Sequence, residues 1–229
     1  MSRPPRPLYT TFAWAYDFVV PSPGGPQPAE VVRLLAGRRT VVDAGCGTGR
    51  HTEALVAARF EVTGVDASPD MIDIARKRVP DARLEVADIL HWRPGETFDG
   101  VLCRGVLNDC DRDLDRQAAL DSLAALLRPG GLLVLGVRDL ERTRARYTHE
   151  PVVTRSAEGV YFRNETHFDG DLMRIHETIS SADDHAVYEF TMRPWTRAEV
   201  EERARAAGFA RIEQRLEGDR IVALLITPA

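Results

Sequence analysis

The sequence predicts an α/β protein built on a doubly wound, mostly parallel β-sheet. Two observations predict this fold. Between residues 38 and 139, short β-branched runs alternate with helical segments at the spacing of βαβ units. The β-branched runs are continuously apolar rather than alternating, which is typical of strands that helices cover on both faces.

Five strands and three helices are expected in this first part. The helix after the second strand begins with Ser68 as its N-cap and Pro69 in its first turn, a combination that favours a helix start. The helix before the fifth strand is expected to end at a Pro-Gly-Gly turn. The expected strands are 40–45, 61–68, 82–89, 98–105 and 132–139, and the expected helices are 49–60, 68–79 and 115–131.

After Asp139 the alternation of strands and helices stops. Residues 150–193 show period-two patterning interrupted by turn-rich stretches, which predicts a small antiparallel meander. The α/β pattern then returns with a helix at 196–209, and the two closing strands are expected at 210–216 and 220–228. Before the first strand, two helices are expected at 9–20 and about 28–37.

These patterns divide the chain into three parts. Residues 1–37 are expected to form a helical cap over a site at the strand ends. Residues 38–148 and 194–229 together form the core, and 149–193 form an antiparallel β lid, inserted after the fifth strand, over the same site.

Composition narrows the classes of partner. The formal net charge of −5 and the pI of about 5.7 argue against nucleic acid or an anionic membrane as the main partner. The sequence has no long apolar run, and prolines near the N-terminus replace the apolar centre of a signal peptide. Three cysteines without a CxxC pair or a His/Cys cluster favour a reducing compartment and no metal. We therefore expect a cytoplasmic protein, and the sequence leaves its oligomeric state open.

The most informative motif, VVDAGCGTGR, places Gly45, Gly47 and Gly49 directly behind the first strand. Ligands of parallel sheets bind beyond the carboxyl ends of the strands, so this loop is the expected binding edge. The dinucleotide fingerprint G-x-G-x-x-G does not fit, because its third glycine would fall on Arg50 or Thr52. This mismatch argues against a nicotinamide-dependent oxidoreductase.

The pattern D-x-G-x-G-x-G resembles the first motif of class I S-adenosylmethionine-dependent methyltransferases. Their Rossmann-like core has a seven-stranded, mostly parallel sheet with the last strand antiparallel. Four later stretches resemble the following motifs of the family in order, namely VTGVDAS, EVADIL, FDGVLCRGVLND and LLRPGGLLVLGVRD. The resemblance covers residues 41–139 and implies S-adenosyl-L-methionine as cofactor, with S-adenosyl-L-homocysteine as product.

The resemblance also implies roles for single residues. Asp66 would bind the ribose hydroxyls, and Asp88 with Ile89 would hold the adenine. Met71 would pack on the adenine or only within its own helix. Asp43 would brace the glycine loop or reach the cofactor's ammonium group through water. The other cofactor-binding residues that the motifs imply are Tyr16, Gly45, Cys46, Gly47, Gly49, Ala67, Arg104 and Gly105.

The meander resembles the lid of small-molecule methyltransferases such as glycine N-methyltransferase and aminosugar N,N-dimethyltransferases. That resemblance implies a small-molecule acceptor methylated on nitrogen or oxygen, with nitrogen slightly favoured. The stretch CRGVLNDC lacks the proline pair of enzymes that methylate DNA bases, so no nucleic-acid substrate is expected. The stretch FAWAYDFVV resembles the N-terminal helix that folds over the cofactor in this group, and Tyr16 is its best-matching residue. It would touch the cofactor, face the acceptor, or pack with its aromatic neighbours.

Candidate acceptor residues follow from position and chemistry. Arg104 and Arg138 end the fourth and fifth strands, so two guanidinium groups are expected at one pocket. This arrangement favours an acceptor with a carboxylate or another anion, unless each arginine pairs with a neighbouring acid. The candidate catalytic residues are Tyr16, Arg138 and His167, and the candidate substrate contacts are Tyr9, Asn108, Asp109, Arg138 and Trp195. The alternative function is a non-catalytic protein that binds the cofactor or its demethylated product.

Overall fold

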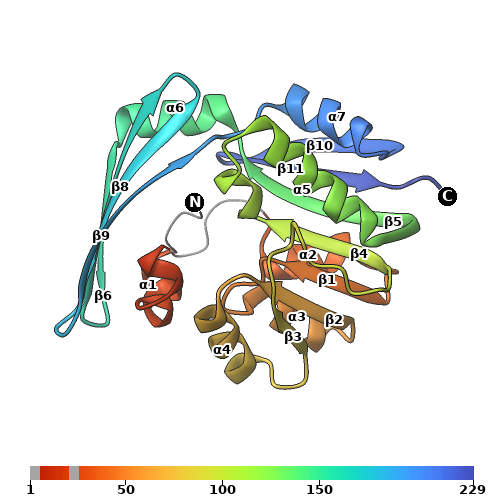
Figure 1. Ribbon diagram of the computed structural model, residues 1–229, viewed down its shortest axis with the longest axis horizontal. Coiled ribbons are helices and arrows are strands. Elements are labelled where there is room, and N and C mark those ends of the chain that lie inside the picture. The colour runs from red at the N-terminus through yellow and green to blue at the C-terminus, as the bar shows by residue number, and fades with distance from the viewer. Residues whose placement is uncertain (1–5, 21–25) are drawn as a thin grey trace.

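Two β-sheets form the framework of the molecule, and the N-terminal segment lies between them (Figure 1). The computed structural model describes residues 6–20 and 26–229. The larger sheet has seven strands, which in spatial order are β10 (Arg211–Glu217), β11 (Arg220–Ile226), β5 (Leu127–Arg138), β4 (Phe98–Arg104), β1 (Thr40–Ala44), β2 (Glu61–Asp66) and β3 (Arg83–Val86). Strand β11 is antiparallel to both of its neighbours, and all other pairs are parallel. The predicted fold class is confirmed.

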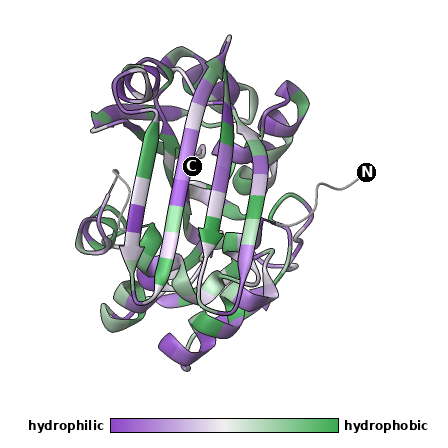
Figure 2. Ribbon diagram, turned by 90° about the vertical axis from the view of Figure 1, so that its left-hand side faces the viewer, coloured by the Kyte–Doolittle hydropathy of each residue, from purple (hydrophilic) through white to green (hydrophobic). Residues whose placement is uncertain are grey.

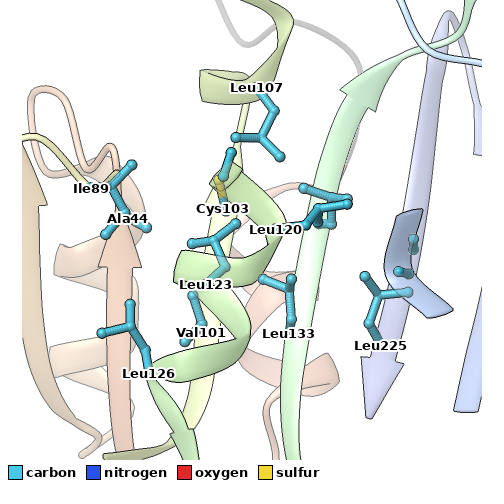
Figure 3. Packing of buried hydrophobic residues seen from close by; sticks show 14 of the residues in the cluster. Ala44, Ile89, Val101, Cys103, Leu107, Leu120, Leu123, Leu126, Leu133 and Leu225 are labelled. Atoms are coloured by element: carbon cyan, nitrogen blue, oxygen red, sulfur yellow. The ribbon is translucent and has the colours of Figure 1, made fainter. Parts of the chain in front are cut away.

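Helices cover both faces of the larger sheet because successive residues of its strands are apolar on both sides. Val41 packs with the helices of one face and Val42 with those of the other. Figure 3 shows the second face, where Leu120 and Leu123 of α5 lie against Val101 of β4. Burial of each such leucine stabilises the fold by about 1.5–3 kcal/mol. The first face is covered by α2 (Pro28–Leu34) and α3 (Arg50–Ala57), with α4 (Pro69–Arg78) beside α3, and the second by α5 (Asp113–Ala125) and α7 (Arg197–Ala206).

The smaller sheet is the predicted antiparallel meander, with one strand more than expected. Its strands are β6 (Val152–Ala157), β7 (Val160–Asp169), β8 (Leu172–Ser180) and β9 (His185–Met192), in that spatial order. Figure 2 shows the alternation of polar and apolar residues along these strands. The apolar set, which includes Phe162, Ile175 and Phe190, is buried on the inner face. We refer to this sheet as the lid.

Helix α6 (Leu140–His149) was not expected from the sequence. It begins directly after β5, where the Asp139 carboxylate accepts a hydrogen bond from the Arg142 backbone N–H at 2.9 Å. Only Leu140 and Thr143 of this helix are buried, so it carries almost no apolar periodicity for sequence analysis to detect. Helix α6 connects the core to the lid (Figure 1).

The N-terminal segment is less regular than the helix predicted at 9–20. It contains two 3₁₀ turns, η1 (Pro7–Tyr9) and η2 (Ala13–Ala15), followed by the short helix α1 (Tyr16–Val19). Phe12 and Val19 pack against Phe162 of the lid, so tertiary contacts rather than helix periodicity place the apolar residues. Residues 1–5 and 21–25 of the predicted cap, including most of the break between its two helices, lie outside the described residues.

Two other boundaries differ from the prediction. Helix α5 spans Asp113 to Ala125 instead of 115–131, because the chain from Leu127 onward is extended and pairs with β4. Helix α2 ends at Leu34 rather than near residue 37. None of the helices in 6–20 and 26–229 combines the length and the apolar character needed to cross a membrane.

Candidate functional site

The glycine loop after β1 turns sharply at the carboxyl edge of the sheet. Gly45 has φ of +75° and donates its backbone N–H to the Val65 carbonyl oxygen at 2.7 Å. A Cβ at Gly45 would lie 2.0 Å from Cγ2 of Val106, so no side chain fits there. Gly47 has φ of +54° and its missing Cβ would meet open space. The loop therefore packs tightly at Gly45 and exposes its backbone at Gly47.

Asp66 at the end of β2 holds this loop in place. Its Oδ2 accepts a hydrogen bond from the Gly47 N–H, and its Oδ1 accepts one from the Ser68 N–H, both at 2.9 Å. Burial raises the pKa of Asp66, while these backbone donors oppose the rise. The carboxylate lies beside the N-terminus of α4, where the hydroxyl of the N-cap residue Ser68 accepts a hydrogen bond from the Met71 N–H.

Asp43 lies deeper, at the end of β1. Its Oδ2 accepts a hydrogen bond of 2.6 Å from the Thr52 hydroxyl of α3, and the residue is 3% exposed. Burial raises the pKa of this carboxyl to about 6, and the hydrogen bond from Thr52 opposes the rise. The bond ties β1 to α3 across the glycine loop.

A cavity of about 620 Å³ opens in front of the loop, beside β2 and α4. Its apolar wall includes Met71, 2% exposed, and Ile89, 6% exposed. Two acidic residues, Asp66 and Asp88, also line it. The predicted site residues that line this cavity are Tyr9, Tyr16, Gly45, Gly47, Asp66, Ala67, Met71, Asp88, Ile89, Arg104, Gly105 and Asp109. We call it the loop cavity.

A smaller cavity of about 110 Å³ lies beneath the same loop. Asp43, Cys46 and Arg104 line it, together with His51 of α3. Burial lowers the pKa of His51 to about 4 and raises the pKa of the Cys46 thiol, so both side chains are neutral at pH 7.

A third cavity, of about 300 Å³, lies between the core and the lid. We call it the lid cavity. Apolar residues of β7, β8 and β9 form its outer wall, and polar residues of the core and of α6 form the opposite side. Five arginines line it, namely Arg6, Arg138, Arg146, Arg155 and Arg220.

Three arginines share one face of the large sheet at its carboxyl edge. Arg104 of β4 lies opposite Gly136 of β5, and Arg138 of β5 lies opposite Arg220 of β11. Residues opposite each other on paired strands point to the same side of the sheet, and so do alternate residues of one strand. Gly136 leaves room for Arg104, whose Cγ would lie 3.2 Å from a Cβ at that position.

Two residues border all three cavities. Tyr16 of α1 and Gly105, which follows β4, each line the loop cavity, the small cavity beneath it and the lid cavity. Gly105 has φ of +85°, and its missing Cβ would meet open space. The loop cavity and the lid cavity therefore meet at Tyr16 and Gly105, and Arg6 and Tyr9 also line both of them.

Asn108 and Asp109, two predicted substrate contacts, line different cavities. Asn108 is 3% exposed, donates from Nδ2 to the Gly105 carbonyl at 2.9 Å and accepts from the Arg138 N–H at 2.8 Å. It lines the lid cavity but mainly joins the loop after β4 to β5. Asp109 lines the loop cavity instead, near Tyr9.

Three predicted site residues lie away from the cavities, and their assignments are corrected. His167 is on the outer face of the lid, where its Nε2 contacts Glu165 at 3.1 Å. Trp195 is fully buried in the core, donates to the Leu107 carbonyl and stacks with Arg116. Gly49 lines none of the three cavities and allows α3 to approach Ala75 of α4.

The sequence missed several residues that the structure brings to the cavities. Arg220 follows a Gly218-Asp219 turn, and in sequence it is only the first residue of an apolar strand. Arg146 and Arg155 belong to α6 and β6, neither of which was expected. No local motif marks them, because the antiparallel pairing of β11 and the packing of the lid bring them to the lid cavity. Within the described part of the chain, no three His, Cys, Asp or Glu residues gather as a metal site.

In fold and in part of its sequence, the chain is similar to methyltransferases. Residues 41–131 match the family model described as the methyltransferase domain. Over 96% of this chain and 99% of the other, the fold is similar to a crystal structure of an S-adenosylmethionine-dependent methyltransferase from Clostridium acetobutylicum, with a TM-score of 0.79 and 18% identity.

Two curated relatives are similar in sequence. A trans-aconitate 2-methyltransferase of Methylobacterium radiotolerans is 39% identical over 108 residues, which cover 46% of this chain and 40% of the relative. An N,N-dimethyltransferase of Saccharopolyspora spinosa, named for dTDP-4-amino-2,3,4,6-tetradeoxy-D-glucose, is 32% identical over 114 residues, 48% of this chain and 46% of the relative. The matched region thus spans less than half the length of these relatives.

Proposed function

We propose that this protein is an S-adenosylmethionine-dependent methyltransferase that transfers a methyl group to a nitrogen or oxygen of a small, anionic acceptor. The observation that carries the proposal is the junction of two cavities at Tyr16 and Gly105. A cofactor in the loop cavity would present its methyl group at this junction to an acceptor in the lid cavity.

The residues of the loop cavity fit this cofactor. Asp66 and Asp88 provide acceptors for ribose hydroxyls and for an adenine amino group, and Met71 and Ile89 provide apolar surfaces for a flat base. The open backbone at Gly47 lets the amino-acid end of the cofactor approach the loop. The S-adenosylmethionine sulfonium supplies a methyl group that is already activated for transfer.

The chain's own contribution is mainly positioning. Direct transfer requires the acceptor atom in line with the methyl carbon, about 3–3.5 Å away, and shielded from water. The lid and the N-terminal segment cover the junction, with Leu8, Phe12 and Val19 buried against lid residues. The arginines of the lid cavity would hold an anionic group of the acceptor.

The names of the two relatives support a small acceptor that carries negative charge. One is named for trans-aconitate and the other for an aminosugar nucleotide. These molecules differ in the atom available for methylation but share anionic groups. A protein that only binds the cofactor remains the alternative function, and binding without turnover would identify it.

The experiment is to incubate the purified protein with S-adenosylmethionine and a panel of small carboxylates, amines and aminosugar nucleotides, and to measure S-adenosylhomocysteine release. We expect turnover with one class of acceptor, and loss of cofactor binding in Asp66→Ala and Asp88→Ala. Cofactor binding that is unchanged in both variants would refute the assignment of the loop cavity.

A further inference from the structure

Arg138 and Arg220 form an unusual cross-strand pair. Their Cα atoms are register partners in the antiparallel pairing of β5 with β11, so both side chains point to the same face of the sheet. Like charges directly opposite each other on neighbouring strands are destabilising. Both arginines line the lid cavity. The pair therefore costs stability at a position where it faces a potential ligand.

Among the described residues, Asp219 is the one carboxylate that forms ion pairs with these two arginines. Asp219 lies against both arginines and against Arg146 of α6. Its Oδ2 is 3.0 Å from Nη1 of Arg138 and 3.2 Å from Nη1 of Arg146, while its Oδ1 is 3.4 Å from Nε of Arg220. One carboxylate thus faces three guanidinium groups. The group of four carries two excess positive charges, and we call it the arginine cluster.

Arg138, Asp219 and Arg220 are largely removed from water, whereas Arg146 at the edge of the cluster is 44% exposed. Arg220 is 6% exposed, and the buried Nε atoms of Arg138 and Arg220 have no hydrogen-bond partner within residues 6–20 and 26–229. Burial lowers the pKa of Arg220 to about 9, and the neighbouring Arg138 charge adds to the effect, so Arg220 remains charged at neutral pH. Buried charges without full pairing are costly, and an arriving anion would remove that cost.

The lid cavity also lacks a base. None of its described lining residues is Asp, Glu or His. Tyr9 and Tyr16 are protonated, because burial raises the pKa of both phenols. His51, in the small cavity beneath the loop, is a poor proton acceptor because burial lowers its pKa to about 4. An acceptor that arrives already deprotonated suits this cavity better than an ammonium group, which must lose a proton before it attacks.

Resting on the proposed function, we propose that the acceptor carries at least two carboxylates. The arginine cluster binds one of them, and an oxygen of the other attacks the methyl group to form a methyl ester. The carboxylate oxygen donates a lone pair to the methyl carbon and forms the C–O bond. The S–CH₃ bond breaks, its electron pair stays on sulfur, and neutral S-adenosylhomocysteine leaves. The carboxylate and the sulfonium both lose their charges, and no proton is released.

The size of the lid cavity agrees with a compact acceptor. A volume of about 300 Å³ is at the lower end of ligand pockets, which suits a molecule of the size of a tricarboxylic acid. A phosphate would also satisfy two guanidinium groups, so the experiment must separate the two anions. It must also separate ester formation from methylation of an amine.

The test uses the whole protein with S-adenosylmethionine labelled in the methyl group. The acceptors are trans-aconitate, tricarballylate, glycerol 3-phosphate and dTDP-4-amino-2,3,4,6-tetradeoxy-D-glucose. Two readouts distinguish the chemistry. Mild base releases the label as methanol only from an ester, and a pH-stat detects one proton per turnover for an ammonium acceptor and none for a carboxylate. Binding of each acceptor to the S-adenosylhomocysteine complex is measured by calorimetry.

The variants are Arg220→Gln, Arg220→Lys and Arg146→Gln, with Arg205→Gln as the matched control. Arg205 is an exposed arginine of α7 that pairs only with Glu201 at 2.8 Å among the described contacts. We expect KM for a tricarboxylate to rise about tenfold or more in Arg220→Gln, from loss of a charge-assisted contact. The rise should be smaller in Arg146→Gln, because Arg146 is 44% exposed, and within twofold in Arg205→Gln. Cofactor affinity and melting temperature report whether each variant is folded.

Base-labile label from a tricarboxylate, without proton release and dependent on Arg220, supports the inference. Base-stable label on the aminosugar with one proton per turnover overturns it and leaves the proposed function standing. Saturable binding of glycerol 3-phosphate but of neither tricarboxylate also overturns it, as does the absence of acceptor binding in a protein that binds S-adenosylhomocysteine. A protein that binds no cofactor refutes the proposed function itself.

Discussion

The Asp66 carboxylate accepts a hydrogen bond from the backbone N–H of Gly47 at 2.9 Å, which joins the end of β2 to the loop behind β1. The same carboxylate accepts from the Ser68 N–H at the start of α4. One side chain thus orders both loops that border the loop cavity. Its carboxylate also lies on the cavity rim, where the proposed cofactor's ribose would compete for its lone pairs.

The first prediction concerns this carboxylate. Asp66→Asn keeps the size of the side chain and one acceptor oxygen, whereas Asp66→Ala removes both. We expect S-adenosylhomocysteine affinity to fall about tenfold in the Asn variant and about a hundredfold in the Ala variant, as measured by calorimetry. Asp73→Asn is the control, because Asp73 is an exposed residue of α4 that pairs with Arg76. Equal affinities of Asp66→Ala and Asp73→Asn would contradict the assignment.

The second prediction separates packing from ligand approach in the glycine loop. Gly45→Ala would place a Cβ 2.0 Å from Val106, in addition to the strain of a positive φ. We expect the free energy of unfolding to fall by at least about 2 kcal/mol in this variant. Gly47→Ala meets only open space, so its stability should fall by about 1 kcal/mol while cofactor affinity falls strongly.

Gly95→Ala is the matched control for both glycine variants. Gly95 has φ of +77° with nothing near its missing Cβ, and it lines none of the three cavities. It reports the cost of backbone strain alone. Urea denaturation gives the stabilities and calorimetry gives the affinities. If Gly47→Ala binds the cofactor as tightly as Gly95→Ala does, the ligand does not approach the backbone at Gly47.

The sequence was sufficient to predict the core and the loop cavity for a physical reason. Parallel strands that are buried on both faces must be continuously apolar, and a loop that bends behind them needs glycine. Both requirements produce a pattern that can be recognised in the local sequence of residues 40–66. Asp66, Met71, Asp88 and Ile89 line one cavity because Asp66 ends β2, Met71 lies in the first turn of α4, and Asp88 and Ile89 lie in the loop after β3.

No local sequence pattern predicts the residues of the lid cavity. Arg220 reaches Arg138 only because β11 inserts antiparallel between β10 and β5, and this pairing joins residues 82 to 94 positions apart in the chain. His167 was only a candidate catalytic residue, because period-two alternation predicts two faces of a strand without showing which one packs on the core. Phe162 and Thr166 on the same strand are buried and therefore mark the inner face. His167 alternates with them and lies on the outer face.

The third prediction follows from the buried Asp43. Its folded-state pKa of about 6 lies above the value of 3.8 for a free carboxyl. As pH rises from 4 to 6, the unfolded chain therefore loses this proton first, and folding stability falls by about 2–3 kcal/mol. Asp43→Asn keeps an acceptor for the Thr52 hydroxyl and has no proton to lose.

We therefore expect the cofactor-free Asn variant to gain stability relative to the parent as pH increases through this window. The measurement is urea denaturation of both proteins at pH 4.5 and 7.5, compared as the difference between the two pH values. The comparison cancels the other titrating groups, which are common to both proteins. Parallel pH profiles for the parent and Asp43→Asn would contradict a raised pKa at this carboxyl.

The fourth prediction concerns the connection between the N-terminal segment and the lid. Arg6 forms a salt bridge with Glu177 of β8, and the Glu177 side chain is only 1% exposed. The Arg6 guanidinium also lies over the Tyr9 and Phe190 rings, at 4.9 and 4.4 Å from their centroids. Glu177→Gln leaves a buried cation without its partner, which we expect to cost about 3 kcal/mol or more. Backbone hydrogen exchange of residues 6–20 should accelerate as the segment loses its attachment to the lid.

His167→Ala is the matched control, because His167 is a lid residue on the opposite face. It should leave hydrogen exchange of residues 6–20 and acceptor KM within twofold of the parent. In Glu177→Gln, by contrast, acceptor KM should rise, because Arg6 and Tyr9 both line the lid cavity. Exchange measured by mass spectrometry resolves the segment directly. Equal exchange in the two variants would show that the buried salt bridge does not hold the segment, and a large loss of turnover in His167→Ala would reinstate a catalytic role for that histidine.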